Sequence, residues 1–503
     1  METMTLRPLW AILVSLLASV LILLTGQRRS NLREFWTFSA ALLKFSLVLS
    51  LLPLVSQKGA IESFRFVLVS GLDFHLRVDL FGLIFALLAS SLWIVTSLYS
   101  VGYMRGGNYT HQTGYFACFA VCVSAAIGIA FSGNLLTFFI FYEILTLATY
   151  PLVIHDRTAE AITSGRKYLA FTLVAGQLLL LAIIWTHALA PGAAFQPGGF
   201  LPAKTPSGIL MLLFALFLFG VGVKAAIMPL HSWLPAAMVA PAPVSALLHA
   251  VAVVKAGTFG VVRIIHYVFG IDLLRQMRLD VVLASAAAAT ILLASIRALG
   301  ETNLKRRLAY STVSQLSYIV LGAALASSTA LAGAMFHFVA HGFMKITLFF
   351  CAGAIYIKTH KLEIADLAGL GRQMPITFTA FTIGALGLAG MPLCAGFISK
   401  WNLGLGALQA GHAVFLAVLV ISGLLNFAYF FPIVYSAFFG RQGQDIQYDE
   451  VAPSMWIPLA VTAVVSIILG VYPNAGPAIY QLAWRAAQGA MSNAAHTLAG
   501  GNL

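Results

Sequence analysis

The sequence predicts an all-α protein that crosses a lipid bilayer many times. Of its 503 residues, 60% are hydrophobic and only 9% are charged, and the mean hydropathy is +0.93. A soluble protein of this length could not bury that much apolar surface. The apolar residues also form long continuous runs, whereas the strands of a membrane β-barrel are short and alternating. The expected fold class is therefore a polytopic helical membrane protein.

Apolar runs separated by polar or Pro/Gly clusters predict about fourteen membrane helices. The first run, Leu6 to Thr25, is too long for the core of a signal peptide, so we expect a retained helix. The tail from Asn474 to Leu503 is rich in Ala and Gly and is expected at the surface. The expected spans are 6–25, 36–56, 78–104, 113–131, 134–154, 163–190, 208–230, 241–267, 279–299, 307–327, 330–357, 374–400, 411–440 and 454–473.

Two of these helices contain proline where a straight helix would avoid it. The seventh, 208–230, runs into Met228-Pro229-Leu230-His231, and the twelfth, 374–400, contains Gly390-Met391-Pro392. Proline removes a backbone donor and clashes with the preceding turn. Inside a membrane such a break survives only where it is buried or lines water. Two broken helices, five apart in the series, indicate two repeated halves of the kind found in secondary transporters.

Basic residues in the loops predict the orientation in the membrane. With the N-terminus outside, fifteen of the 29 Lys and Arg fall in inner loops, nine fall on the other side, and five lie within helices. Cytoplasmic loops carry the excess of Lys and Arg in membrane proteins. We therefore expect an integral protein of a bacterial inner membrane with both termini on the outer face.

The composition argues against several other partners. The net charge is +13, but the basic residues are scattered through short loops and form no patch interleaved with stacking aromatic residues, so no nucleic-acid partner is predicted. The four cysteines lie within apolar runs and form no CxxC pair. We expect no metal and no cofactor.

Five single charges lie inside otherwise apolar stretches: Glu143, Lys224, Lys255, Lys345 and Lys400. A charge at the bilayer centre costs roughly 2.5–3.5 kcal/mol on insertion scales, and such residues usually face a protein interior where they carry protons or ions. Glu143 is the only acid deep in a predicted helix, and Lys224 is expected near the middle of its helix. The five residues predict stations of a proton path.

Histidines extend this series. His337, His341 and Lys345 recur at i, i+4 and i+8, so they share one helix face. Histidine titrates near neutral pH and transfers protons readily. His at i and i+4 can also bind zinc, but no Glu or Cys completes such a site and Lys345 would repel a cation. His249 lies on the helix of Lys255, where a hydrogen-bonded core histidine is an equal alternative.

Four charged positions have a less defined role. Lys400, expected near the end of its helix, could instead extend to the outer interface. Lys44 lies within the second helix with no carboxylate on that helix as a partner. Asp79 and Asp156 lie near helix ends, where capping or solvation explains them equally well.

The chain resembles a known family at these positions, over roughly residues 75–440. It is similar to the antiporter-like, proton-pumping subunits of respiratory complex I, of Mrp-type Na⁺/H⁺ antiporters and of membrane-bound hydrogenases. The resemblance rests on the order and spacing of Tyr99-Ser-Val-Gly-Tyr-Met104, Phe139-Ile-Phe-Tyr-Glu143, Lys224-Ala-Ala-Ile-Met-Pro-Leu-His-Ser-Trp-Leu-Pro235, Ala240-Pro-Ala-Pro-Val-Ser-Ala-Leu-Leu-His249, Lys305-Arg-Arg-Leu-Ala-Tyr-Ser-Thr-Val-Ser-Gln315, His337 through Lys345, and Ala395-Gly-Phe-Ile-Ser-Lys400.

This resemblance implies two inverted five-helix repeats, helices 4–8 and 9–13, with helices 7 and 12 broken. The expected division is 1–111, 112–267, 268–440 and 441–503. The resemblance also implies residue roles: a gating ion pair (Glu143 with Lys224), a central relay (Lys255 with His249 nearby), a bridge between half-channels (His337 and Lys345) and a terminal site (Lys400). It implies other membrane subunits as partners.

The expected function is proton translocation by one subunit of a cation/proton antiporter or of an NADH-quinone oxidoreductase- or hydrogenase-type complex. Whether Na⁺ moves as well as protons stays open, as does whether the parent complex is an enzyme. Two alternatives remain. One is a stand-alone secondary transporter, and the other is a membrane subunit that couples its proton path to CO₂ hydration by a soluble zinc partner.

Overall fold

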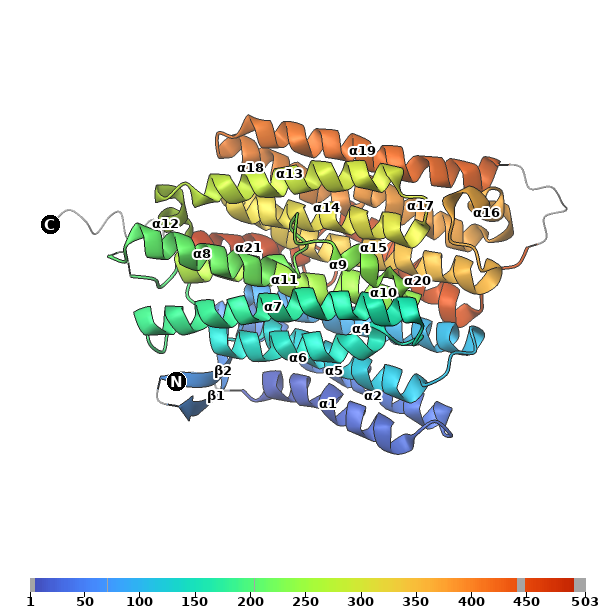
Figure 1. The fold of residues 1–503 in the computed structure, drawn as a ribbon, viewed down its shortest axis with the longest axis horizontal. Coiled ribbons are helices and arrows are strands. Elements are labelled where there is room, and N and C mark those ends of the chain that lie inside the picture. Colours follow the sequence, from blue (N-terminus) through green and yellow to red (C-terminus); the bar gives the residue numbers. More distant parts are fainter. Residues whose placement is uncertain (1–4, 70, 203, 441–447, 493–503) are drawn as a thin grey trace.

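The computed structural model describes residues 5–69, 71–202, 204–440 and 448–492. Long helices lie roughly side by side in one elongated bundle (Figure 1). A hairpin of β1 (Ala60–Val69) and antiparallel β2 (Leu72–Asp79) lies at one end, which we call the hairpin end. The short helix α16 (Leu370–Gln373) lies at the opposite end, which we call the basic end.

The first half of the bundle consists of long helices and the short helix α3. They are α1 (Arg7–Thr25), α2 (Ser30–Leu49), α3 (Leu52–Lys58), α4 (Leu80–Gly106), α5 (Gln112–Ala130), α6 (Leu135–Val153), α7 (Ala159–Leu189) and α8 (Ser207–Gly222).

Short pieces then alternate with long helices. They are α9 (Trp233–Ala236), η1 (Ala237–Val239), α10 (Ala242–Ala246), the π-helical η2 (Leu247–Val251), α11 (Val253–Arg263), the π-helical η3 (Ile264–Phe269), α12 (Ile271–Gln276), α13 (Leu279–Gly300), α14 (Leu304–Ala324), α15 (Ser328–Thr359), η4 (Ile364–Leu367), α16, α17 (Pro375–Ala389), α18 (Ala395–Gln409), α19 (Ala413–Phe439), α20 (Pro453–Val471) and α21 (Ile479–Ser492).

The fold class predicted from the sequence is confirmed. Within the described ranges, eleven helices are long and apolar enough to cross a membrane. The other three predicted spans correspond to α8, to α14 and to the α17–α18 pair. Breaks shorten α8 and the helices of the α17–α18 pair. Helix α14 is less apolar than the eleven because it is rich in Ser, Thr and Gln. The exact number of spans and the division into inverted repeats stay predictions.

Both expected interruptions are present. Helix α8 stops at Gly222, and the next helical residue is Trp233. Helix α17 ends at Ala389, and α18 begins at Ala395. Gly390, which follows α17, has φ of +92°, a conformation that L-residues with a side chain rarely adopt. The proline-containing motifs therefore mark the positions at which the two helices break.

The hairpin was not predicted from the sequence. The main chain of His75 binds the start of α6: the Gly133 N–H donates to the His75 carbonyl at 2.8 Å, and the His75 N–H donates to the Thr137 side-chain hydroxyl at 2.8 Å. Burial alternates from Leu72 to His75 and again from Leu76 to Asp79, but its phase shifts between His75 and Leu76, so both faces of the strand carry buried side chains. The membrane-helix pattern on either side concealed this shorter signal.

The prediction that the whole tail from Asn474 lies at the surface is wrong in part. Residues Ile479–Ser492 form α21, which packs against α15 and α4. Its buried residues recur with helical spacing and are Ile479, Leu482, Ala483, Ala486, Ala487 and Ala490. Small alanines on this stripe allow α21 to lie close to its neighbours.

Candidate functional site

Glu143 lies in the interior of α6, partly buried, with its carboxylate toward α7. Asn134 caps the start of the helix by accepting a hydrogen bond from the Thr137 N–H at 2.9 Å. Oε1 of Glu143 is buried and has no hydrogen-bond partner among the described residues. A Cβ added to Gly176 of α7 would lie only 2.5 Å from that oxygen. Glycine at position 176 therefore makes room for the carboxylate.

Lys224 is fully buried, but it does not lie in the middle of a helix as predicted. Because α8 ends at Gly222, Lys224 belongs to the interruption that follows. Its Nζ donates to the Tyr142 carbonyl at 2.6 Å and lies 3.3 Å from the centre of the Tyr142 ring. The Tyr142 hydroxyl in turn donates to the Gly220 carbonyl at 3.1 Å. Tyr142 thus joins α6 to the end of α8.

The expected ion pair between Glu143 and Lys224 is not formed in the described structure, where the Lys224 Nζ lies more than 4.0 Å from both carboxylate oxygens of Glu143. They are close neighbours, since Lys224 binds the residue directly before Glu143. The break in α8 directs the ammonium toward the Tyr142 main chain, whereas the carboxylate faces α7. The sequence motif placed both groups in one region but could not give their orientation.

Helix α11 passes directly against the interruption after α8. A Cβ on Gly257 would overlap the main chain of Lys224 and Ala225, and it would lie 2.9 Å from the Ala225 Cα. Only glycine permits this approach without a shift of the backbone. The contact brings the Lys224 segment beside the helix that carries Lys255.

Lys255 and His341 are in direct contact between α11 and α15. The Lys255 Nζ lies 3.1 Å from His341 Nδ1, and it donates to the Phe338 carbonyl at 2.6 Å. Both side chains are fully buried. His249 lies in the π-helical segment η2, and its Nδ1 is 3.0 Å from the Thr312 hydroxyl of α14. π-helical segments often occur at functional sites because they change the direction of single side chains.

The stripe His337, His341 and Lys345 is buried on α15 as expected, but its members contact three different helices. His337 Nδ1 lies 2.8 Å from the Ser399 hydroxyl of α18. His341 meets Lys255 of α11, and the Lys345 ammonium donates to the Ser311 hydroxyl of α14. The rings of His337 and His341 are 6.0 Å apart. Helix α15 therefore connects the two parts of the predicted path.

Lys400 lies inside α18 rather than near the end of a helix, because α18 continues to Gln409. Its Nζ donates to the carbonyls of Leu388 and Ala389 at 2.6 and 3.2 Å. These are among the last carbonyls of α17, which have no partner within that helix and attract a cation. The prediction of a terminal position is therefore wrong, and the side chain turns toward the break and not toward an interface.

Lys44 does not join this cluster. It is fully buried between α2, α1 and α4, where its ammonium donates to the Ser15 hydroxyl and lies 5.2 Å from the centre of the Trp93 ring. Asp79 has the capping role that was one of its two expected roles, since it accepts a hydrogen bond from the Gly82 N–H at 2.8 Å.

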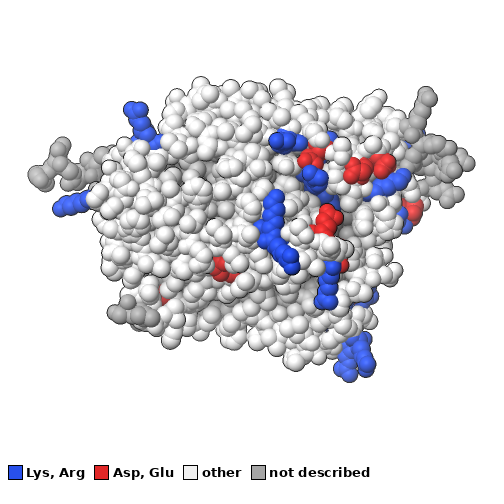
Figure 2. Space-filling view, in the orientation of Figure 1, with Lys and Arg blue, Asp and Glu red and all other residues white. Residues whose placement is uncertain are grey.

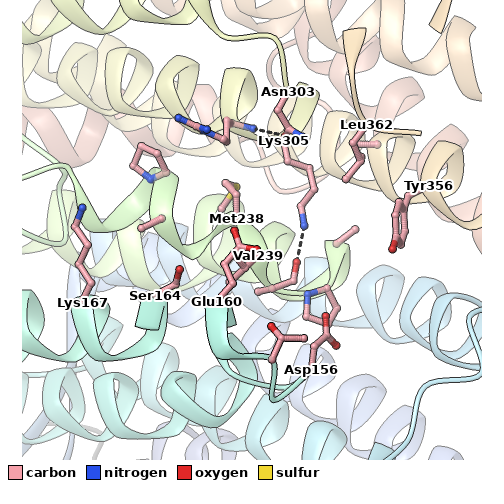
Figure 3. A pocket seen from close by; sticks show the side chains of 18 of the residues that line it. Asp156, Glu160, Ser164, Lys167, Met238, Val239, Asn303, Lys305, Tyr356 and Leu362 are labelled. Carbon is pink, nitrogen blue, oxygen red and sulfur yellow. Dashed lines mark hydrogen bonds between the residues drawn. The ribbon is translucent and has the colours of Figure 1, made fainter. Parts of the chain in front are cut away.

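A cavity of about 550 Å³ lies at the basic end (Figure 3). Asp156, Glu160 and Lys167 line one side of it, and Lys305 extends into it from the start of α14. The Lys305 Nζ donates to the Ala240 carbonyl at 2.5 Å. Burial raises the pKa of Asp156, while the nearby Lys305 charge partly opposes the rise. The cavity therefore holds groups of both charges.

Sequence reasoning missed the hydroxyl groups that hold the predicted residues. Ser311, Thr312 and Ser399 each contact one of them, and Tyr318 lies 5.5 Å from the His337 ring and 5.0 Å from the Lys400 Nζ. The available signal was weak: buried hydroxyl residues within otherwise apolar helices. Many buried hydroxyl groups bind only the backbone of their own helix. Composition therefore does not separate them from the hydroxyl groups that contact a residue of the predicted path.

The model of the family described as "NADH:quinone oxidoreductase/Mrp antiporter, TM" matches residues 132–426, a stretch that contains Glu143, both helix breaks and Lys400. The chain belongs to this family. Within it, the chain is 33% identical to NADH-quinone oxidoreductase subunit N of Desulforudis audaxviator over 406 residues, which cover 77% of this chain and 80% of that protein.

The chain is similar both to relatives named as oxidoreductase subunits and to relatives named as antiporter subunits. It is 28% identical to one of the subunits of the Na(+)/H(+) antiporter of Alkalihalophilus pseudofirmus over 498 residues, covering 92% of this chain but only 61% of that protein. A chain in the structure of the Mrp complex from Dietzia sp. DQ12-45-1b has the same fold, with a TM-score of 0.86, 22% identity and 98% of each chain covered. Similarity across most of the length confirms the family predicted from the motifs.

Proposed function

We propose that this chain is a proton-translocating, antiporter-like subunit of a multi-subunit membrane complex, either a cation/proton antiporter or an NADH-quinone oxidoreductase-type complex. One observation carries the proposal: buried titratable groups follow one another across the middle of the bundle. Lys255 contacts His341 at 3.1 Å, and the His341 ring lies 6.0 Å from the His337 ring. Tyr318 then lies between His337 and Lys400.

The groups in this series have free positions for further hydrogen bonds. Nε2 of His249, His337 and His341 and Oε1 of Glu143 are buried without a partner among the described residues. Buried polar atoms in proteins are nearly always hydrogen-bonded, often to water. We therefore propose that water completes the path between Glu143, Lys224 and Lys255, and between the histidines and Lys400.

The cavity at the basic end supports proton entry from that side. It is lined by Lys305, whose helix carries Ser311 and Thr312, the partners of Lys345 and His249. The other end of the path is proposed to lie beyond Lys400, where a second cavity of about 220 Å³ at the end of α18 includes Gln409. Entry and exit then lie on opposite faces of the membrane.

The surface charge supports an orientation with the basic end in the cytoplasm. In the view of Figure 2, most visible Lys and Arg side chains gather toward the basic end, with Asp and Glu among them. We propose a bacterial inner-membrane protein with both termini on the outer face. A cysteine at Ala159 should react with an impermeant thiol reagent only from the cytoplasmic side, and one at Pro191 only from outside. The reverse labelling pattern would contradict this orientation.

The central test of the function is Glu143→Gln, because glutamine keeps the shape and removes the charge. In everted vesicles that contain the full complex, quenching of a pH-sensitive dye should fall to background in this variant. Equal amounts of assembled complex are checked on a native gel. Normal quenching in the variant would eliminate Glu143 as a member of the path.

A second test concerns the partners. The described chain has a series of proton-binding groups, and its sequence has no GxxxxGK[ST] nucleotide-binding motif. We propose that other membrane subunits supply the driving step. Purified alone in liposomes, the chain should show no Na⁺-driven pH change. A strong signal from the isolated chain would favour a stand-alone transporter.

A further inference from the structure

Four phenylalanines fill the space between Lys255 and the hairpin end. Phe81 and Phe85 come from α4, Phe259 from α11 and Phe338 from α15, and all four are fully buried. The ring centres of Phe81 and Phe85 lie 4.7 and 5.3 Å from Phe259, and 5.7 and 5.2 Å from Phe338. We call these four residues the aromatic plug.

The aromatic plug borders Lys255 directly on one side. The Lys255 Nζ lies 4.5 Å from the centre of the Phe338 ring and donates to the Phe338 carbonyl. Phe259 follows Lys255 by one helical turn in the direction of the hairpin end. Since helix α11 rises about 1.5 Å per residue, Arg263 lies about 12 Å beyond Lys255 on the same helix.

Arg263 and Asp79 close the far side of the aromatic plug. Arg263 is buried and donates to both carboxylate oxygens of Asp79, the residue that caps α4, with the Nη2 contact at 2.8 Å. Its guanidinium carbon lies 4.7 Å from the Phe259 ring and 4.5 Å from the Tyr267 ring. A fixed cation thus lies between the phenylalanine rings and the surface.

We infer that the aromatic plug and the Arg263–Asp79 pair form a barrier that prevents a proton on Lys255 from escaping toward the hairpin end. A proton crosses a dry apolar layer only at a large desolvation cost. Arginine does not deprotonate in proteins, so Arg263 cannot relay a proton. The contact of Lys255 with His341 then leaves a lateral route along α15. This inference rests on the proposed proton path.

Asp79 keeps the barrier stable. A buried guanidinium without its carboxylate would be strongly destabilising, whereas the paired ions have little net charge. The cap on α4 fixes the carboxylate in position, and the rings of Phe195, Phe259 and Tyr267 surround the guanidinium. Asp79 therefore stabilises, at this position, a group that cannot give up its proton.

The test is the passive proton leak through the full complex, measured without the driving reaction. Everted vesicles that contain the complex receive a pH jump, and an internal dye reports proton entry. Phe259→Ser shortens the side chain and admits water, so the leak should rise several-fold over wild type. Phe259→Leu keeps the layer apolar and should stay at the wild-type rate.

Phe336→Ser is the matched control. Phe336 is as buried as Phe338 and lies two residues away on α15, but it faces Tyr480 of α21, with ring centres 5.5 Å apart. Its serine variant should leak at the wild-type rate. An assembled Phe259→Ser complex that is as tight as Phe336→Ser would overturn the barrier.

If Phe259→Ser does not assemble, the double variant Arg263→Gln with Asp79→Asn provides the test, since asparagine can still cap α4. It removes both charges and should also raise the leak several-fold, and a wild-type leak would again overturn the barrier. A failure of the proposed function can be distinguished from a failure of the barrier. It would appear as the absence of driven proton transport in the wild-type complex, at any rate of passive leak.

Discussion

Replacing Gly176 with alanine should displace the Glu143 carboxylate without removing its charge. A Cβ at position 176 would lie 2.5 Å from Oε1 and 2.9 Å from Cδ of Glu143, whereas ordinary contacts begin at 3.4 Å. The difference between 2.5 and 3.4 Å requires a shift of about 0.9 Å. The carboxylate is the end of a flexible side chain, so it moves while the backbone of α6 stays in place.

A displacement of this size is large for a proton-transfer group. Misplacing a reacting group by about 1 Å can cost up to about 100-fold in rate, and we expect driven proton transport by Gly176→Ala to fall about 10- to 100-fold. The substitution should not weaken α7, the helix that carries position 176, since alanine has a higher helix propensity than glycine. The assay is dye quenching in everted vesicles with equal amounts of assembled complex.

Two further variants separate the displacement of the Glu143 carboxylate from a general effect of replacing a helical glycine with alanine. Gly208→Ala makes the same change on α8, where an added Cβ meets nothing within 4 Å, and it should transport normally. Adding Glu143→Asp to Gly176→Ala shortens the acid by one methylene and should recover part of the lost transport. Wild-type transport in Gly176→Ala alone would refute the reasoning that the position of Glu143 matters.

Three other expected outcomes follow from single contacts. Lys224→Arg keeps a charge that does not deprotonate, so transport should fail nearly as badly as in Lys224→Ala; normal transport would make Lys224 an electrostatic anchor. Ser311→Ala removes the hydroxyl that binds Lys345 and should lower transport about tenfold, since a hydrogen bond to a charged group contributes about 1.5–3 kcal/mol; an unchanged rate would show that the contact is dispensable. The hydrogen bond from His75 and the nearby arginines lower the pKa of Glu62. The resulting stability of the hairpin is present above about pH 4.3 and is lost as the pH falls through the lower folded-state pKa, which faster amide exchange in β1 at acid pH would report and Glu62→Gln should abolish.

Residue chemistry along the chain was sufficient to predict that single charges and histidines are buried inside the bundle, while their role in proton transport stays a prediction. Single charges within apolar runs can be recognised without knowledge of their neighbours, and Lys255, Lys345 and His341 are fully buried as that pattern requires. Proline within a membrane span identified both broken helices for the same reason. These features depend on local sequence and on the cost of an unpaired polar group in lipid.

Relations between distant segments were not predictable in the same way. Whether Lys224 faces Glu143 or the Tyr142 carbonyl depends on where α8 ends, and hydropathy does not locate that residue. The aromatic plug combines residues from α4, α11 and α15, and each of them reads as an ordinary apolar residue in the sequence. The hairpin and α21 were missed because their short amphipathic patterns lie beside much stronger membrane-helix signals.

The attachment of the hairpin to the start of α6 limits how Glu143 can move. Main-chain contacts of His75 with Gly133 and Thr137 hold the first turn of α6 against β2. A movement of α6 is then a tilt about its attached first turn, which lies at the hairpin end. Glu143 lies eight residues along α6 from Leu135, or about 12 Å from this attached end. A tilt of about 5° would carry Glu143 sideways by about 1 Å, while the opposite end of the helix, beside the charged cavity, would travel further.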